Sequence, residues 1–151
     1  MATRGMQKLS RFIEAALIVL MAVVLLLLIT LPWSITWVTE RTHDDPFYIR
    51  YLVILGYSGI MAELVLWQSR GIMHNVNHGC VFSADTVRRM RTLAVECMIL
   101  AVFYLATMFW MSKFFMAALF VVFVLFGCVL LVFAELFRQA NEYKAENDMT
   151  I

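Results

Sequence analysis

The sequence predicts an all-α integral membrane protein: a four-helix bundle in a single transmembrane domain, residues 1–151, with its N- and C-termini in the cytoplasm. Composition is the first indication, because 63% of the residues are hydrophobic and 15% are charged, against about 45–50% and 25% in soluble domains. The second is that the apolar residues gather in long segments. The third is the uneven placement of lysine and arginine between these segments, which predicts the orientation of membrane helices.

Four apolar segments are long enough to span a membrane, since a hydrocarbon core about 30 Å thick needs about 20 helical residues. Because the core offers no water to backbone polar groups, each span should be a helix. The predicted spans are residues 12–33, 47–67, 93–111 and 114–137. The first follows basic residues, as a cleaved signal peptide would. Its apolar run of about 20 residues is longer than the 7–15 residues of a signal, which favours a retained span.

Basic residues divide unevenly between the two sides of the predicted bundle. Cytoplasmic segments carry the excess of lysine and arginine, so the loop 68–92 and the tail 138–151 are expected in the cytoplasm. The basic residues on this side are Arg4, Lys8, Arg11, Arg70, Arg88, Arg89, Arg91, Arg138 and Lys144, and those on the other are Arg41, Arg50 and Lys113. The expected partners are the bilayer and its anionic headgroups, which attract juxtamembrane basic clusters. The net charge of +1 indicates no nucleic-acid partner.

The second, third and fourth helices are expected to extend beyond the membrane into the cytoplasm. The second helix can run to about Asn77, where Gly79 is a plausible C-terminal stop. Ser83 is suited to an N-cap, and Asp85 in the following turn favours the helix dipole. The third helix would then cover residues 84–111, and the fourth would continue through the tail. Two residues, Ser112 and Lys113, remain between them, which predicts a tight antiparallel hairpin.

Two motifs resemble a known family. The loop "GCVFSADTVRRMRTLA" is similar to a Gly-x-x-Phe-Ser…Val-x-Arg-Met/Leu-Arg signature, and the C-terminal "FAELFRQANEYKAENDMTI" to a helix that ends in Glu-Asn-Asp-Leu-Thr. Together they resemble the small four-helix bacterial membrane proteins grouped as DUF2975, a family of unknown function. The resemblance implies a multi-pass protein of the bacterial inner membrane and transfers no activity. Val81 stands where the family usually has proline, which loosens the expected turn.

The loop also holds the residues that look most like a metal site. His74 and His78 are four residues apart, so they share a helix face, and Cys80 follows. Zinc needs three or four ligands, and a helix that ends at Gly79 would take Cys80 out of that geometry. A wet helix end is therefore the favoured interpretation, with His74, His78 and Cys80 as weak metal candidates. The three cysteines are too few and too scattered for a disulfide framework.

One glutamate lies near the cytoplasmic end of each span: Glu14, Glu63, Glu96 and Glu135. Each has an arginine three or seven residues away on the same helix face, and the predicted partners are Arg11, Arg70, Arg89 and Arg138. Ionisable groups within a span usually face the bundle interior or water. The pattern predicts a polar layer at the cytoplasmic mouth of the bundle. This layer is either a structural network of ion pairs, the favoured interpretation, or a site for a cation, a proton or a cationic ligand.

No nucleophile–base arrangement, phosphate loop or haem-type histidine pair is present in the sequence, so we expect no enzyme activity and no cofactor. The favoured function is non-enzymatic: binding, sensing, regulation or protection (immunity) in a bacterial inner membrane. The alternative is a small oligomeric transporter or channel that uses the glutamate layer. A homo-oligomer or another membrane protein is a further expected partner. Gly56, Gly59 and Gly127 are small residues that allow helices to approach closely.

Overall fold

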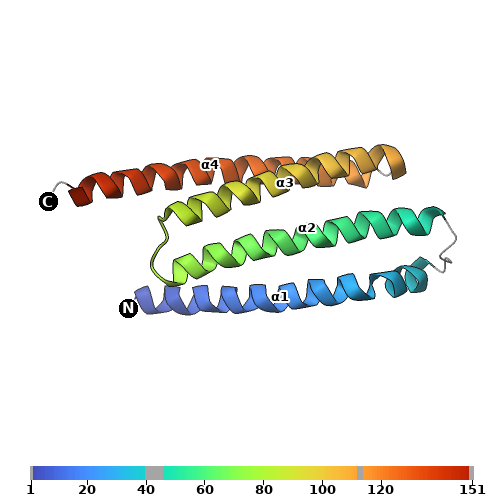
Figure 1. The fold of residues 1–151 in the computed structure, drawn as a ribbon, viewed down its shortest axis with the longest axis horizontal. Coiled ribbons are helices and arrows are strands. Elements are labelled where there is room, and N and C mark those ends of the chain that lie inside the picture. Colours follow the sequence, from blue (N-terminus) through green and yellow to red (C-terminus); the bar gives the residue numbers. More distant parts are fainter. Residues whose placement is uncertain (1, 40–45, 112–113, 150–151) are drawn as a thin grey trace.

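The computed structural model describes residues 2–39, 46–111 and 114–149, which form four α-helices (Figure 1). These are α1 (Ala2–Thr39), α2 (Pro46–Asn77), α3 (Ala84–Met111) and α4 (Phe115–Met149). All four are long and apolar enough to cross a membrane, so the predicted all-α class is confirmed, and the helices have the length and composition of a multi-pass membrane protein. The predicted loop after the first span and the turn at Ser112 and Lys113 lie outside the described residues, as do Arg41 and the side chains of Arg4 and Lys8.

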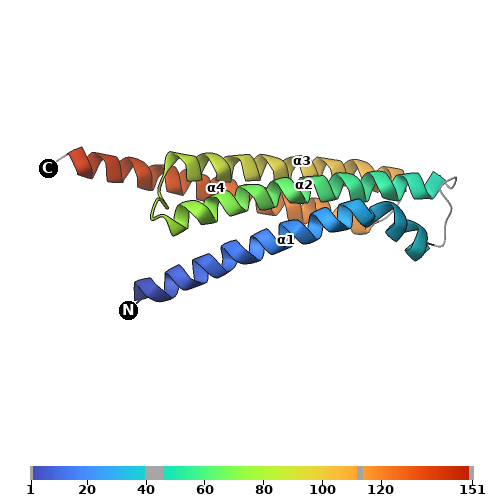
Figure 2. The same cartoon turned by 60° about the horizontal axis from the view of Figure 1, so that its bottom comes forward.

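Within the described ranges, the backbone of each helix comes close only to that of its neighbours in the chain: α1 to α2, α2 to α3, and α3 to α4. Figure 1 shows the two chain termini and the α2–α3 turn at the same end of the molecule, which we call the termini end. The predicted bundle therefore needs a correction, because α1 does not close against α3 or α4. Figure 2 shows α1 inclined to the other three helices. Since lipid is as apolar as leucine, no hydrophobic force drives α1 into the remaining space.

The closest packing joins α3 and α4, as the predicted hairpin requires. Gly127 of α4 leaves room for α3, because a Cβ there would lie 3.3 Å from the Ala94 backbone oxygen. Nearby, the rings of Tyr104 and Phe123 stack with centroids 5.5 Å apart. Tyr104 also belongs to the main buried cluster, with Met61 of α2 and Leu100 of α3. The helices α2, α3 and α4 thus share one core.

A glycine also determines how α1 packs on α2. A Cβ on Gly59 would lie 2.5 Å from Cδ2 of Leu28, so the predicted close crossing is confirmed at this glycine and not at Gly56, which faces open space. Beyond this contact α1 passes through Pro32, which lacks the N–H that an uninterrupted helix would bond. Figure 2 shows α1 bending near this end.

The α2–α3 turn forms as the sequence predicts. Gly79 has a φ of +74°, the left-handed region that glycine enters without steric cost. Its N–H donates to the Val76 carbonyl at 3.2 Å, and the Cys80 N–H donates to the Asn75 carbonyl at 2.9 Å. These are the two hydrogen bonds of a Schellman C-cap. The Thr86 N–H then donates to Ser83 Oγ at 3.2 Å, which confirms Ser83 as the N-cap of α3.

Candidate functional site

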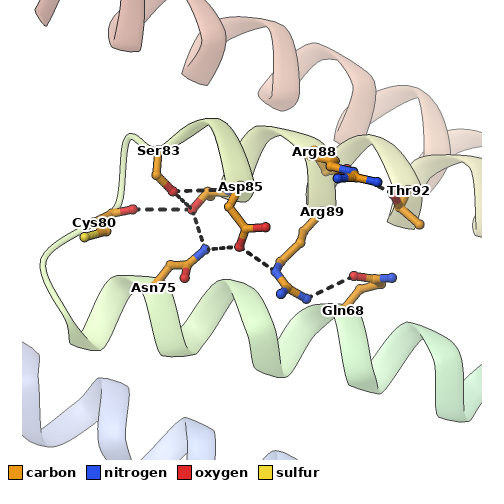
Figure 3. A network of polar contacts seen from close by, with 9 residues as sticks. Gln68, Asn75, Cys80, Ser83, Asp85, Arg88, Arg89 and Thr92 are labelled. Atoms are coloured by element: carbon orange, nitrogen blue, oxygen red, sulfur yellow. Dashed lines mark hydrogen bonds and ion pairs between the residues drawn. The ribbon is translucent and has the colours of Figure 1, made fainter.

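A polar network joins the end of α2 to the start of α3 (Figure 3). The Asn75 side chain donates to Asp85 Oδ2 at 2.8 Å and to Thr86 Oγ1 at 3.1 Å. Thr86 is fully buried, and its hydroxyl donates to the Cys80 carbonyl at 3.4 Å. The sequence offered Asp85 only as a partner of the helix dipole, and the role of Asn75 was missed. Asn75 belongs to α2 and Asp85 and Thr86 belong to α3, so the network holds the two helices in register.

Arg89 lies flat against α2 at Gly71. A Cβ on Gly71 would lie 2.6 Å from Cζ and 2.8 Å from Nε of Arg89, so only a glycine admits the guanidinium there. Arg89 Nε donates to Asp85 Oδ2 at 2.8 Å, and Nη1 donates to Gln68 Oε1 at 3.4 Å (Figure 3). The predicted pair of Arg89 with Glu96 is not formed. The same Gln68 side chain lies close to the Glu96 carboxyl group, so its amide stands between the two charges.

Glu14 meets α2 rather than Arg11, its predicted partner. Its carboxylate accepts a hydrogen bond from the Asn77 side chain and lies 3.4 Å from His74 Nδ1. The ring of His74 lies against that of His78, with centroids 4.2 Å apart. Because these side chains face one another across two helices, the contact helps to fix α1 on α2 at the termini end.

The weak metal candidates His74, His78 and Cys80 do not come together as a site. No group of three metal-ligating side chains is found among the residues described here. The ring of His78 turns to the His74 carbonyl at 2.8 Å, and Cys80 lies beyond the helix end, where its thiol is free and exposed. The Schellman turn is the physical reason, since it reverses the chain between His78 and Cys80.

Glu135 forms the one predicted pair that appears in the described part of the chain. Its carboxylate is 2.5 Å from Arg138 Nη2 and 3.4 Å from Arg91 Nη2 of α3. Arg138 also reaches Glu142 at 2.7 Å. All four side chains are about half exposed. Exposed pairs of this kind contribute about 0–1 kcal/mol each, so the cluster tethers α4 to α3 only weakly.

Glu63 and Glu96 are the unusual carboxylates. The Oε2 atom of each is buried and has no hydrogen-bond partner among the described residues. Glu96 as a whole is 8% exposed. Glu63 lies about 200° around α2 from Met61 and about 140° from Gln68, at about 100° per residue. Both of those residues contact α3, so Glu63 points away from α3 and from Glu96.

The four glutamates therefore do not form one layer. Glu14 contacts the end of α2, at the level of the first turn of α3. Glu135 meets Arg91, about one and a half turns further along α3, and Glu96 lies five residues beyond Arg91. At about 1.5 Å per residue these levels spread over about 15 Å. The prediction of a convergent layer was wrong, because each helix pair engages its own carboxylate: Glu14 between α1 and α2, Glu96 between α2 and α3, and Glu135 between α3 and α4.

Two hollows were not predicted. One is a groove of about 920 Å³ between α1 and the unit of α2, α3 and α4, which we call the α1 groove. Its walls are aliphatic, and Leu100, Tyr104 and Phe123 face it from α3 and α4. The Tyr104 hydroxyl donates to Ser58 Oγ at 2.8 Å beside it. The groove exists because α1 does not pack against α3 or α4 within the described ranges. The sequence pattern of a single helix does not predict which other helices it will contact.

The other hollow, the basic pocket, lies between α2 and α3 at the termini end and has a volume of about 230 Å³. Its lining is Trp67, Arg70, Gly71, His74, Asn75 and Arg89. The sequence signal was present as the basic residues around the turn. These arginines predict the membrane orientation, but their positions in the sequence do not show that the Arg89 side chain packs against α2 at Gly71.

Comparison with curated proteins finds no match, and comparison with solved structures finds none either. Comparison with family models matches residues 48–151 to a family described as "Protein of unknown function (DUF2975)". The matched segment covers α2 from Tyr48 onward, α3 and α4, and α1 precedes it. It contains the α2–α3 network, the basic pocket and the two motifs in which the resemblance was seen. With well over half of its residues matched, the chain belongs to the DUF2975 family.

Proposed function

We propose that this chain is a non-enzymatic multi-pass protein of a bacterial inner membrane that binds a hydrophobic molecule dissolved in the bilayer. Both termini are placed in the cytoplasm, since nine of the 12 basic residues lie on that side. Binding would serve sensing, regulation or protection against membrane-active compounds. The observation that carries the proposal is the α1 groove, which is the largest of the hollows described above.

The chemistry of the α1 groove indicates the class of ligand. Ligand sites typically have volumes of about 300–1,000 Å³, are mostly apolar and carry a few polar groups, and the groove of about 920 Å³ lies within that range. Its hydroxyls are those of Ser34, Ser58, Tyr51 and Tyr104 within walls of leucine, valine and isoleucine. A ligand with a hydrocarbon body and one hydrogen-bonding group fits this lining. A catalytic role has no support from the lining, which includes no base beside its serines.

A groove-filling variant tests the proposal. Ala62 lines the α1 groove, whereas Ala118 of α4 is exposed and does not. The protein in nanodiscs would be labelled with a long-chain alcohol that carries a photoreactive diazirine, and labelled peptides would be identified. We expect labelling within α1 and α2 that falls several-fold in Ala62→Trp and is unchanged in Ala118→Trp. Equal labelling of the two variants, or crosslinking of a second copy at this groove, would contradict the proposal.

A second function, movement of protons or cations by a small oligomer, is favoured by the buried and unpartnered oxygens of Glu63 and Glu96. A carboxylate in an apolar surrounding is costly unless it is protonated or paired. The test is ion flux into proteoliposomes for Glu63→Gln and Glu96→Gln, with Glu135→Gln as the matched control, because Glu135 is already paired with Arg138. Flux that falls only in the first two variants supports this function. Absence of flux in the wild-type protein rejects it.

A further inference from the structure

The basic pocket contains two guanidinium groups that are held in different ways. Arg89 is fixed by Asp85 and Gln68 through Nε and one hydrogen of Nη1. Arginine has five N–H groups, so three of those of Arg89 remain available among the described residues. Arg70 forms no ion pair with another described residue. One positive charge is thus positioned by the fold, and a second is left uncompensated beside it.

The position of the basic pocket in the chain matches a membrane interface. Trp67 closes the second predicted span and lines the pocket, and its side chain is 55% exposed. Tryptophan is enriched at the level of lipid headgroups, where one end of the ring is apolar and the other is wet. Basic pockets between membrane helices at this level are suited to phosphate headgroups.

An apolar path leads from the basic pocket toward the middle of the membrane. On α2 the residues Gly71, Trp67, Leu64, Ile60 and Tyr57 follow one another at spacings of three and four, so they share one helix face. Leu64 is 45% exposed and Ile60 is 57% exposed. At the inner end, Tyr57 and Phe103 border a third hollow of about 450 Å³, whose lining is otherwise aliphatic residues and methionine of α3 and α4.

The length of this path matches one leaflet. Gly71 and Tyr57 are 14 residues apart in sequence, which is about 21 Å along a helix at about 1.5 Å per residue. Half of a bilayer about 40–45 Å thick, headgroups included, is about 20–22 Å. A free phosphate would use only the pocket, whereas a phospholipid would use the pocket and the path. The path therefore favours the lipid.

We propose that the basic pocket binds the phosphate of one anionic phospholipid, whose acyl chain lies along the exposed face of α2 as far as Tyr57. Arg70 and Arg89 supply the positive charge and the N–H donors, and the Trp67 ring covers the glycerol region. All of these residues fall within 48–151, the segment matched by the family model. The basic pocket shares no lining residue with the α1 groove. The lipid proposal can therefore be tested independently of the proposed function.

The test compares lipid binding by the wild-type protein and by arginine variants, each as the full chain in detergent. Native mass spectrometry would measure retention of added phosphatidylglycerol, phosphatidylcholine or water-soluble glycerol phosphate. Arg70→Gln removes a pocket charge, and Arg88→Gln removes the same charge from an exposed neighbour of Arg89 that does not line the pocket. Arg70→Lys keeps the charge, and the melting temperature of each lipid-free variant controls for folding.

We expect one phosphatidylglycerol to bind wild type in preference to phosphatidylcholine. Arg70→Gln should weaken its binding about fivefold, the effect of about 1 kcal/mol per basic residue. Arg88→Gln should stay within about twofold of wild type because Arg88 does not line the pocket, and Arg70→Lys should do so because it keeps the charge. Equal weakening by Arg70→Gln and Arg88→Gln would mean diffuse attraction and overturn the site. Equal retention of phosphatidylcholine, or displacement of phosphatidylglycerol by glycerol phosphate, would overturn the anionic phospholipid as its ligand.

Discussion

Replacement of Asn75 by alanine should destabilise the protein through the α2–α3 network. Two hydrogen bonds are lost: one to the Asp85 carboxylate at 2.8 Å and one to Thr86 Oγ1 at 3.1 Å. Hydrogen bonds to charged groups contribute about 1.5–3 kcal/mol and neutral ones about 0.5–1.5 kcal/mol. The Asp85 side chain is 52% exposed, so its bond falls at the low end. Alanine is a better helix former than asparagine and adds up to about 0.7 kcal/mol to the free energy of unfolding. The net decrease in this free energy is therefore about 1.5–2 kcal/mol.

The control for this variant is Asn141→Ala. Asn141 lies inside α4 and forms no side-chain hydrogen bond to another described residue, so only the gain in helix propensity remains. Free energies of unfolding would be measured by titration of the micelle-bound protein with a denaturing detergent and followed by circular dichroism. We expect Asn75→Ala to be less stable than Asn141→Ala by about 2–3 kcal/mol, because the gain in helix propensity is common to both variants. A difference below about 0.5 kcal/mol would refute the reasoning that the network holds the turn.

Three further predictions follow from local features of the structure. A double-mutant cycle of Ser58→Ala and Tyr104→Phe should give a coupling energy of about 0.6–1.7 kcal/mol for their 2.8 Å hydrogen bond, and additive effects would show that the bond contributes nothing. Gly71→Ala should fail to give the usual gain of about 1 kcal/mol, because its Cβ displaces the Arg89 guanidinium. The gain should reappear in an Arg89→Ala background, and its absence there would count against this explanation. Gly79→Ala should cost about 1–2 kcal/mol because φ is +74°, measured by the same unfolding titration; a cost near zero would contradict the strain.

Local signals in the sequence were sufficient to predict the α2–α3 turn. Gly79, Ser83 and Asp85 each act within a few residues of their own position, so their effects do not depend on the rest of the fold. The predicted helix end at Asn77 and the range 84–111 agree with the structure. The long apolar segments were likewise sufficient for the four helices, because backbone pairing within lipid leaves few alternatives.

The glutamate partners could not be predicted in this way. Spacing along one helix shows that two side chains share a face, but a neighbouring helix can offer a nearer partner. His74 and Asn77 of α2 replace Arg11 as the partners of Glu14, and Gln68 separates Glu96 from Arg89. Glu135 and Arg138 remain paired because they are three residues apart on α4, and Arg91 of α3 adds a second, longer contact to Glu135 without replacing Arg138.

The position of α1 is the part of the fold that sequence patterns leave open. None of its most apolar window is buried in the described structure, so its apolar residues do not direct it toward a core. A few contacts specify where it meets α2: the close approach at Gly59, the contacts of Glu14, and two long hydrogen bonds, from Ser10 Oγ to Met73 Sδ and from the Tyr48 hydroxyl to the Pro32 carbonyl. Because so few contacts fix the position of α1, a groove is left between α1 and the unit of α2, α3 and α4.

The placement of the charges connects the two proposed sites to different parts of the chain. On α2, Asn77 engages Glu14 of α1, Trp67, Arg70 and Gly71 line the basic pocket with Arg89 of α3, and His74 takes part in both. The helix α1 lies outside the segment matched by the family model, while the basic pocket lies within it. An anionic lipid at the pocket would therefore be a property of the unit of α2, α3 and α4. A ligand in the α1 groove would depend on a helix that this unit holds only along one side.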